Sequence, residues 1–237
     1  DRVIALNPRA TDACDLKATL LASAGEFDLA QRACRPAFWG DEPPHELRGR
    51  AAWVLYQSGA REKAIEAMLK VLKDVPGYRW GLDILLLWLG DTPGHARYPE
   101  VAERFTDLAP LDAVAWGHRA AAALARQQRE AACGFLRRAI ELDPSYTYGV
   151  RNLADTLFRE GRKDEALRVL ADSPQAATDE SLLRLRLHLA LEMKDDVAAK
   201  GAVETWLQLP EVDDSLLQEA IHECERAGRR SLVQDAF

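Results

Sequence analysis

The sequence lacks any segment rich in lysine or arginine, and it lacks a long apolar run. Its 237 residues include 31 Lys and Arg against 38 Asp and Glu, which gives a formal net charge of −7. Proteins that bind a phosphate backbone concentrate positive charge on one face, so no nucleic-acid partner is expected. The longest apolar run covers residues 84–89, whereas a membrane-spanning helix needs about 20 apolar residues. Membrane insertion is therefore not expected either.

Cysteine is scarce, and its few positions are scattered along the chain. The four cysteines are Cys14, Cys34, Cys133 and Cys224. None forms a Cys-x-x-Cys pair or stands at metal-ligand spacing from a histidine. We therefore expect buried free thiols in a reducing, cytoplasmic compartment, with no metal site and no cofactor.

Short catalytic motifs are also missing. The sequence contains no Gly-rich phosphate loop, no His-Glu-x-x-His and no Gly-x-Ser-x-Gly. Its acidic residues are spread over the expected outer faces of helices, where a solvated charged surface explains them better than acid–base chemistry. The chain is not expected to be an enzyme by itself.

A regular period is what the sequence does contain. Pro76, Pro110 and Pro144 are equally spaced along the chain, and Pro8 lies two periods before Pro76. A fixed period of about 34 residues is typical of a solenoid, in which each unit buries its apolar face only against its neighbours.

Small residues recur at fixed positions within the period. Alanines occupy two recurrent positions: Ala18, Ala52, Ala120 and Ala154 in one, and Ala30, Ala64, Ala132, Ala166 and Ala198 in the other. Small side chains at a crossing let two helices approach to about 8–10 Å. Between the two positions, Gly25, Gly59 and Gly161 are in phase and can end the first helix of each pair.

The expected fold is therefore all-α, with about six antiparallel helix pairs followed by a C-terminal helix. The expected helices cover residues 11–23, 27–38, 45–58, 61–74, 79–90, 98–108, 113–126, 129–142, 147–159, 163–171, 179–192, 195–208 and 213–227. The repeats then lie near 11–42, 45–76, 79–110, 113–144, 147–178 and 179–210, in a single domain over 1–237. The third repeat, with its insert at 92–95 and Tyr98 at the small-residue position, is expected to have a looser pair or a longer turn. The sixth is shorter than the others.

Residues 116–170 carry a consensus of aromatic, small and proline positions. The positions are filled by Trp116, Ala120, Ala132, Leu136, Ala139 and Pro144, and then by Leu153, Ala154, Leu157, Gly161, Ala166 and Leu170. This pattern resembles the tetratricopeptide repeat family over nearly the whole chain. The resemblance implies a right-handed superhelix whose first helices line a concave groove, used as a scaffold that binds a protein or peptide.

We count each repeat from its origin, which is Pro8, Glu42, Pro76, Pro110 or Pro144. If the resemblance holds, the residues 4, 7, 8 and 11 positions after each origin face the groove, because they share one face of a helix. Gly49 and Gly117 stand at two of these positions and would leave open space at the base of the groove. The predicted groove residues of repeats 2 to 5 are Arg50, Trp53, Trp80, Asp83, Leu87, His118, Tyr148, Arg151, Asn152 and Asp155. Aromatic anchors with an Arg for a carboxylate suit capture of a peptide. The alternative is that the large side chains pack against the next helix, and that Arg151 pairs with Asp155.

Some members of this family grip a C-terminal carboxylate with a clamp of lysine, asparagine and arginine residues. Asn152 and Arg184 match that pattern, and Arg184 joins the predicted groove residues on this ground. His118 replaces the other asparagine, while Val114 and Glu180 replace the lysines. The clamp is therefore incomplete.

Three other interpretations stay open. Residues 4–8 echo residues 140–144, as though the chain began at the end of a repeat. It would then be a substrate-recruiting or regulatory segment of a larger, transferase-type enzyme. A self-associating structural solenoid, and hence a homo-oligomer, is the second alternative. The spacing of Pro110, Trp116 and Arg119 also resembles the repeats of prenyltransferase α-subunits, but in one repeat of six.

Overall fold

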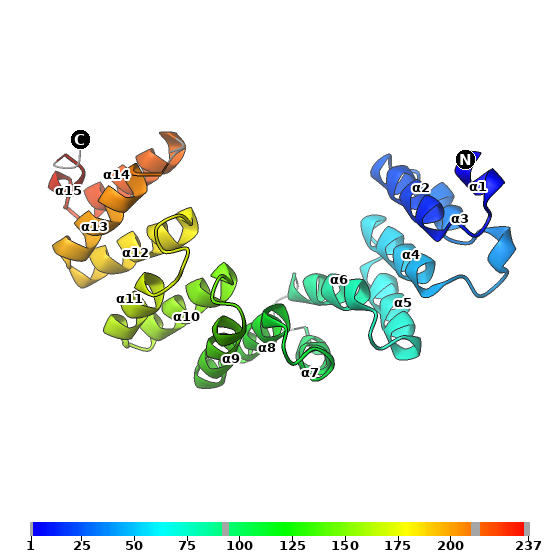
Figure 1. Cartoon of the computed structure of the whole chain (residues 1–237), viewed down its shortest axis with the longest axis horizontal. Coiled ribbons are helices and arrows are strands. Elements are labelled where there is room, and N and C mark those ends of the chain that lie inside the picture. The colour runs from blue at the N-terminus through cyan, green and yellow to red at the C-terminus, as the bar shows by residue number, and fades with distance from the viewer. Residues whose placement is uncertain (1, 92–94, 210–213, 235–237) are drawn as a thin grey trace. The chain divides into compact units, whose positions relative to one another are not determined.

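The computed structural model describes residues 2–91, 95–209 and 214–234, and this part of the chain is helical without a strand (Figure 1). Contacts divide the chain into two compact units, Asp1–Val101 and Ala102–Phe237. The boundary falls within α7 (Tyr98–Leu108), in the third repeat. Residues 92–94 of the expected insert, residue 210 at the end of the sixth repeat and residue 213 at the start of the expected last helix lie outside the described residues.

The first unit contains two complete helix pairs and the first helix of a third. Its elements are α1 (Arg2–Leu6), α2 (Thr11–Ser23), α3 (Phe27–Ala33), the 3₁₀ helix η1 (Ala37–Trp39), α4 (His45–Gln57), α5 (Arg61–Asp74) and α6 (Arg79–Gly90). Within it α2 packs on α3, α4 on α5, and α2 also on α4. First helices thus contact first helices along the stack, as a repeat array requires.

The second unit is built from helix pairs of the same kind. After α7 come α8 (Ala113–Ala125), α9 (Arg129–Leu142), α10 (Thr147–Arg159), α11 (Lys163–Ala171), α12 (Glu180–Met193), α13 (Asp196–Leu207), α14 (Asp214–Arg226) and α15 (Ser231–Gln234). The pairs are α8 with α9, α10 with α11, and α12 with α13. None of the described helices is both long enough and apolar enough to cross a membrane.

The recurrent alanines lie where the helices cross. Every alanine of the first position is fully buried, and so are those of the second position up to Ala166. The prediction for the sixth repeat is wrong: Ala198 is only half-buried, and the next residue, Ala199, is fully buried in its place. Asp195 caps α13 by accepting a hydrogen bond from the Ala198 backbone nitrogen, which sets where this helix starts.

The in-phase glycines end the first helices in a left-handed conformation. Gly25, Gly59 and Gly161 have φ angles of 80°, 87° and 79°, which glycine adopts without steric cost. In the fourth repeat the equivalent residue is Gln127, with φ 60°, and in the sixth Lys194 takes φ 58°. These two turns keep the same conformation although their residue has a Cβ atom.

The second helix of the first repeat is shorter than predicted. The sequence predicted a helix over 27–38, but α3 ends at Ala33. Pro36 explains the difference, because a proline has no N–H to donate and disfavours helical geometry in the residue before it. The chain leaves the helix, forms η1 and returns through residues 40–44 to α4.

Candidate functional site

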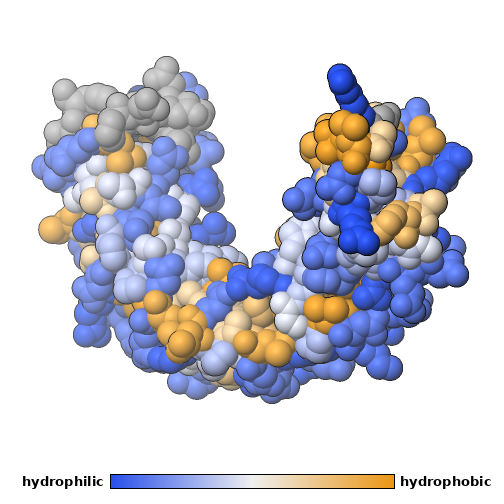
Figure 2. Space-filling view, turned by 45° about the vertical axis from the view of Figure 1, so that its right-hand side comes forward, coloured by the Kyte–Doolittle hydropathy of each residue, from blue (hydrophilic) through white to orange (hydrophobic). Residues whose placement is uncertain are grey.

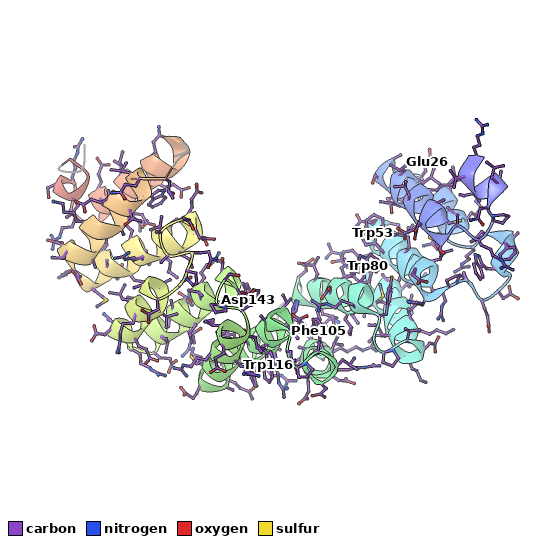
Figure 3. All side chains as sticks on the ribbon, viewed as in Figure 1. Glu26, Trp53, Trp80, Phe105, Trp116 and Asp143 are labelled. Atoms are coloured by element: carbon purple, nitrogen blue, oxygen red, sulfur yellow. The ribbon has the colours of Figure 1, made fainter. Side chains whose placement is uncertain are left out.

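One face of the first unit brings together side chains from three successive first helices. Arg50 on α4 donates from Nε and Nη2 to the two carboxylate oxygens of Asp15 on α2, at 2.7 and 2.9 Å. Its guanidinium lies over the ring of Trp53 at 5.0 Å and over the ring of Trp80 on α6 at 4.8 Å. Figure 3 shows both tryptophans, on α4 and α6. We call these four residues the Arg50 cluster.

The Arg50 cluster changes what this face can bind. The side chain of Arg50 is only 16% exposed, and Asp15 already satisfies it with two parallel hydrogen bonds. Such a bidentate pair, stacked between aromatic rings, is strongly held. Arg50 is therefore paired within the chain, and its role as a groove residue stays a prediction. The cluster is a rigid platform with an aromatic surface.

Asp15 is a residue of this face that the sequence prediction did not include. It stands seven residues after Pro8, at one of the four positions expected to face the groove. The predicted groove covers repeats 2 to 5 and does not include the first repeat. Applied there, the same register gives Asp15 and Leu16, which both lie on this face.

Exposed leucines extend this face beyond the cluster. Leu16 on α2 is 59% exposed, and Leu87 on α6 is 58% exposed. Figure 2 shows apolar surface in separate patches among hydrophilic residues. Leu87 is therefore largely exposed and is not packed against a neighbouring helix, as the alternative interpretation had it. Asp83, also on α6, accepts hydrogen bonds from Arg79 Nε at 2.9 and 3.0 Å.

The expected glycine floor is filled by tyrosine. A Cβ atom on Gly49 would lie 2.7 Å from the ring of Tyr78, and one on Gly81 would lie 2.5 Å from the same ring. In the second unit Tyr146 sits in the same way against Gly117 and Gly149. Burial raises the pKa of both tyrosines well above the ordinary value. These glycines therefore make room for a neighbouring repeat and leave no open floor.

The second unit presents an exposed set on α10. Tyr148 is 42% exposed, its ring is tilted against Tyr146 at 5.7 Å, and its backbone oxygen accepts a hydrogen bond from Asn152 Nδ2 at 2.8 Å. Asp155 pairs with Arg159 at 2.9 Å, and not with Arg151, as the alternative interpretation had it. Arg151 is exposed and has no carboxylate within ion-pair distance among the described residues.

The remaining predicted site residues have partners within the second unit. His118 on α8 is half-buried, with its ring tilted against Phe105 of α7 at 6.2 Å. Arg184 on α12 pairs with Glu219 of α14 at 3.2 Å. Phe105 and Trp116 lie in the region of α7 and α8 shown in Figure 3. Trp116 packs on Phe135 at 5.9 Å and donates to the Pro110 backbone oxygen.

Metal and thiol chemistry find no support in the described part of the chain. No group of three or more His, Cys, Asp or Glu side chains there could hold a metal ion. All four cysteines are free and buried, as predicted. Burial, followed by the nearby charge of Asp15, raises the pKa of the Cys34 thiol to about 12. A thiol that stays protonated at neutral pH is a poor nucleophile.

Comparison with known proteins agrees with this geometry. The tetratricopeptide repeat family model matches residues 123–189. A structure of the C-terminal part of a TPR repeat-containing protein from Cytophaga hutchinsonii is 14% identical and has a TM-score of 0.61, covering 92% of this chain and 90% of that chain. The fold is a tetratricopeptide-repeat solenoid.

Two further tetratricopeptide-repeat structures resemble the chain to a similar degree. A tetratricopeptide repeat protein from Parabacteroides merdae is 14% identical, with a TM-score of 0.57 over 94% of this chain and 88% of that chain. MamA from Desulfovibrio magneticus RS-1, from residue 41 to its end, is 18% identical, with a TM-score of 0.58 over 70% of this chain and 94% of that chain. At these identities the likeness concerns the fold. No match was found among curated proteins.

Proposed function

We propose that this tetratricopeptide-repeat solenoid is a non-catalytic scaffold that binds a protein or peptide through the exposed face of its first helices. The observation that carries the proposal is the pair of exposed leucines, Leu16 and Leu87, beside the Arg50 cluster. Leucines scattered singly over a surface need no explanation, but exposed leucines beside an aromatic platform are typical of an interface.

The chemistry of the face favours an apolar anchor in the first unit. Arg50 is neutralised by Asp15, so the two tryptophans and the leucines supply the available contact area. A Leu, Met or aromatic side chain of the partner suits this surface because its burial removes apolar area from water on both sides. In the second unit, Arg151 beside Tyr148 offers a positive charge for an acidic residue.

Affinity capture with single-residue variants tests the proposal. The purified chain, Leu87→Glu and Arg151→Glu are each immobilised and exposed to an extract of the source cells. Val197→Glu serves as the matched control, because Val197 is 85% exposed on α13, a second helix. We expect a partner that the wild type and the control retain equally and that at least one of the two face variants, each testing the face of its own unit, loses.

The partner is then purified and its affinity for each variant measured by calorimetry. Loss of an interface anchor should weaken binding by more than about tenfold. Equal affinity of Leu87→Glu, Arg151→Glu and Val197→Glu would overturn the proposal, since it would place the interface elsewhere. Circular dichroism of each variant confirms that the helices are intact.

A further inference from the structure

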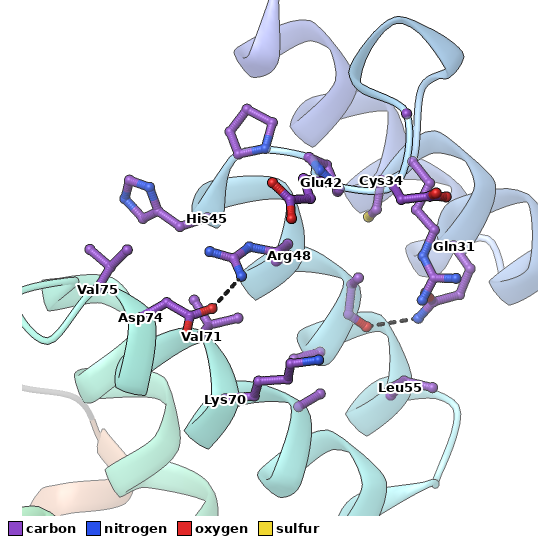
Figure 4. A pocket seen from close by; sticks show the side chains of 18 residues that line it. Gln31, Cys34, Glu42, His45, Arg48, Leu55, Lys70, Val71, Asp74 and Val75 are labelled. Carbon is purple, nitrogen blue, oxygen red and sulfur yellow. Dashed lines mark hydrogen bonds and ion pairs between the residues drawn. The ribbon is translucent and has the colours of Figure 1, made fainter.

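A pocket of about 790 Å³ lies between α3, α4 and α5, on a different surface from the exposed first-helix face (Figure 4). Its volume is within the range of sites that enclose a ligand, about 300–1,000 Å³. The pocket is contained in the first unit, and its walls are the end of α3, the loop of residues 40–44, one side of α4 and the second half of α5.

The pocket exists because α3 is short. It has 7 residues, whereas α5, the second helix of the next repeat, has 14. In α5 the second half contains Val71 and Leu72, which are 3% and 1% exposed. Their counterparts one period earlier are Ala37 and Phe38 of η1, and both are exposed. The space that two more helical turns, about 11 Å, would fill is therefore empty.

The floor of this space is apolar and made of small side chains. Ala51, Ala52 and Leu55 of α4 and Ala67 and Val71 of α5 line it. An alanine-rich floor admits a helix at close range, as it does at the other helix crossings of this chain. Helices that bind in grooves do so through an apolar stripe of this kind.

The pocket is lined by three carboxylates, Asp41, Glu42 and Asp74, and by three cations, Arg35, Arg48 and Lys70. Arg48 gives one nitrogen, Nη1, to Asp74 at 2.6 Å, while its Nε is buried without a hydrogen-bond acceptor. Lys70 and Arg35 line the pocket and have no carboxylate within ion-pair distance in the part of the chain that the structure describes. Figure 4 shows Glu42 and Lys70 on opposite sides, with Arg48 between them. A carboxylate would be accepted on the Lys70 side.

We propose that this pocket binds a short amphipathic helix of a partner protein, which takes the place of the missing turns of α3. The helix presents small apolar side chains to the alanine floor and a carboxylate to Lys70 and Arg48. This interface is separate from the first-helix face, so either can fail without the other. A second copy of this chain is the competing occupant.

The test uses a designed peptide as the probe. A fluorescein-labelled, acetylated peptide of about twelve residues carries alanine and leucine on one helical face and glutamate on the other. Its counterpart carries lysine in place of each glutamate. Fluorescence anisotropy measures the affinity of the full chain for both peptides. We expect the glutamate peptide to bind and the lysine peptide to bind at least about tenfold more weakly.

Three variants locate the binding. Ala67→Trp fills the pocket, and Lys70→Glu reverses its charge; both residues line it. Lys63→Glu is the control, because it makes the same charge change on the exposed side of the same helix, outside the pocket. We expect binding to be lost in Ala67→Trp, weakened at least about fivefold in Lys70→Glu and unchanged in Lys63→Glu. Leu87→Glu should also leave it unchanged.

Several results would overturn the proposal. One is that the glutamate peptide does not bind at concentrations up to about 1 mM. The others are that the two peptides bind with equal affinity, or that Ala67→Trp and Lys63→Glu bind the glutamate peptide with equal affinity. Sedimentation velocity addresses the competing occupant. A dimer of the wild-type chain that Ala67→Trp abolishes would overturn the proposal in favour of self-association through the pocket.

Discussion

Gly117 shows how one hydrogen atom in place of a side chain decides the packing of two repeats. The hydroxyl and ring of Tyr146 occupy the position that a Cβ atom on Gly117 would need. Tyr146 is held on its other side by Gly149, where a Cβ atom would lie 3.0 Å from the ring. The ring therefore has little freedom to move away from a larger residue.

We predict that Gly117→Ala lowers the free energy of unfolding by about 1–3 kcal/mol through overpacking against Tyr146. Gly134→Ala is the matched control, because Gly134 lies within α9 with nothing within 4 Å of its Cβ position. That change should stabilise by up to about 1 kcal/mol, from helix propensity alone. Urea denaturation measures both. Equal shifts in the same direction would show that Tyr146 does not constrain Gly117.

The burial of Cys34 should make the free energy of unfolding depend on pH. Its pKa rises from the ordinary value of 9.0 to about 12, mainly because burial disfavours the thiolate. A raised folded-state pKa means that the fold favours the protonated thiol. Its contribution to stability is therefore complete below pH 9 and is lost as the pH rises toward 12. We expect Cys34→Ala to lose less stability than the wild type between pH 8 and pH 10.5, measured by urea denaturation. An identical pH slope in both proteins would contradict this assignment.

At the scale of the helix element, the turn between α8 and α9 departs from the glycine pattern. Gln127 adopts φ 60°, and the left-handed conformation costs an L-residue about 1–2 kcal/mol. We predict that Gln127→Gly raises the free energy of unfolding by about 1 kcal/mol. Arg126→Gly, at a neighbouring residue with φ −91°, should give no gain. A stabilisation of the same size at both positions would show that the turn conformation is not its cause.

The helices were largely predictable from the sequence, and the reasons are specific. Each repeat has three landmarks in the sequence: a glycine in the left-handed turn, an alanine at the helix crossing and a proline in the loop. Because these landmarks recur at a fixed period, the predicted limits of most helices lie close to the observed ones. The end of α3 was missed because Pro36 was read as lying inside a helix of the usual repeat length. In the first unit the structure brings Arg50, Trp53 and Trp80 together. The sequence could not predict the pairing of Arg50 with Asp15, since these residues are 35 apart in the sequence.

At the scale of the whole molecule, contacts gather in two units, Asp1–Val101 and Ala102–Phe237. In a repeat array, stability is carried by contacts between neighbours, so each unit can open by itself. We predict that Leu136→Ala, at a fully buried position of α9, costs about 2–5 kcal/mol and speeds hydrogen exchange within residues 102–209. Residues 2–91 should keep their wild-type rates. Faster exchange in both units, measured by mass spectrometry, would show that the chain unfolds as one body.

The tyrosine that lies against two glycines sets a limit on rearranging this protein by design. Gly49, Tyr78 and Gly81 recur as Gly117, Tyr146 and Gly149, two periods of the repeat later. In phase with Gly49, the alternate repeats carry Asp15 and Asp83. Deleting the second or the fourth repeat would set a tyrosine ring against Asp15 or Asp83, where only a hydrogen atom fits. The smallest interchangeable part of this solenoid is therefore a tandem of two repeats.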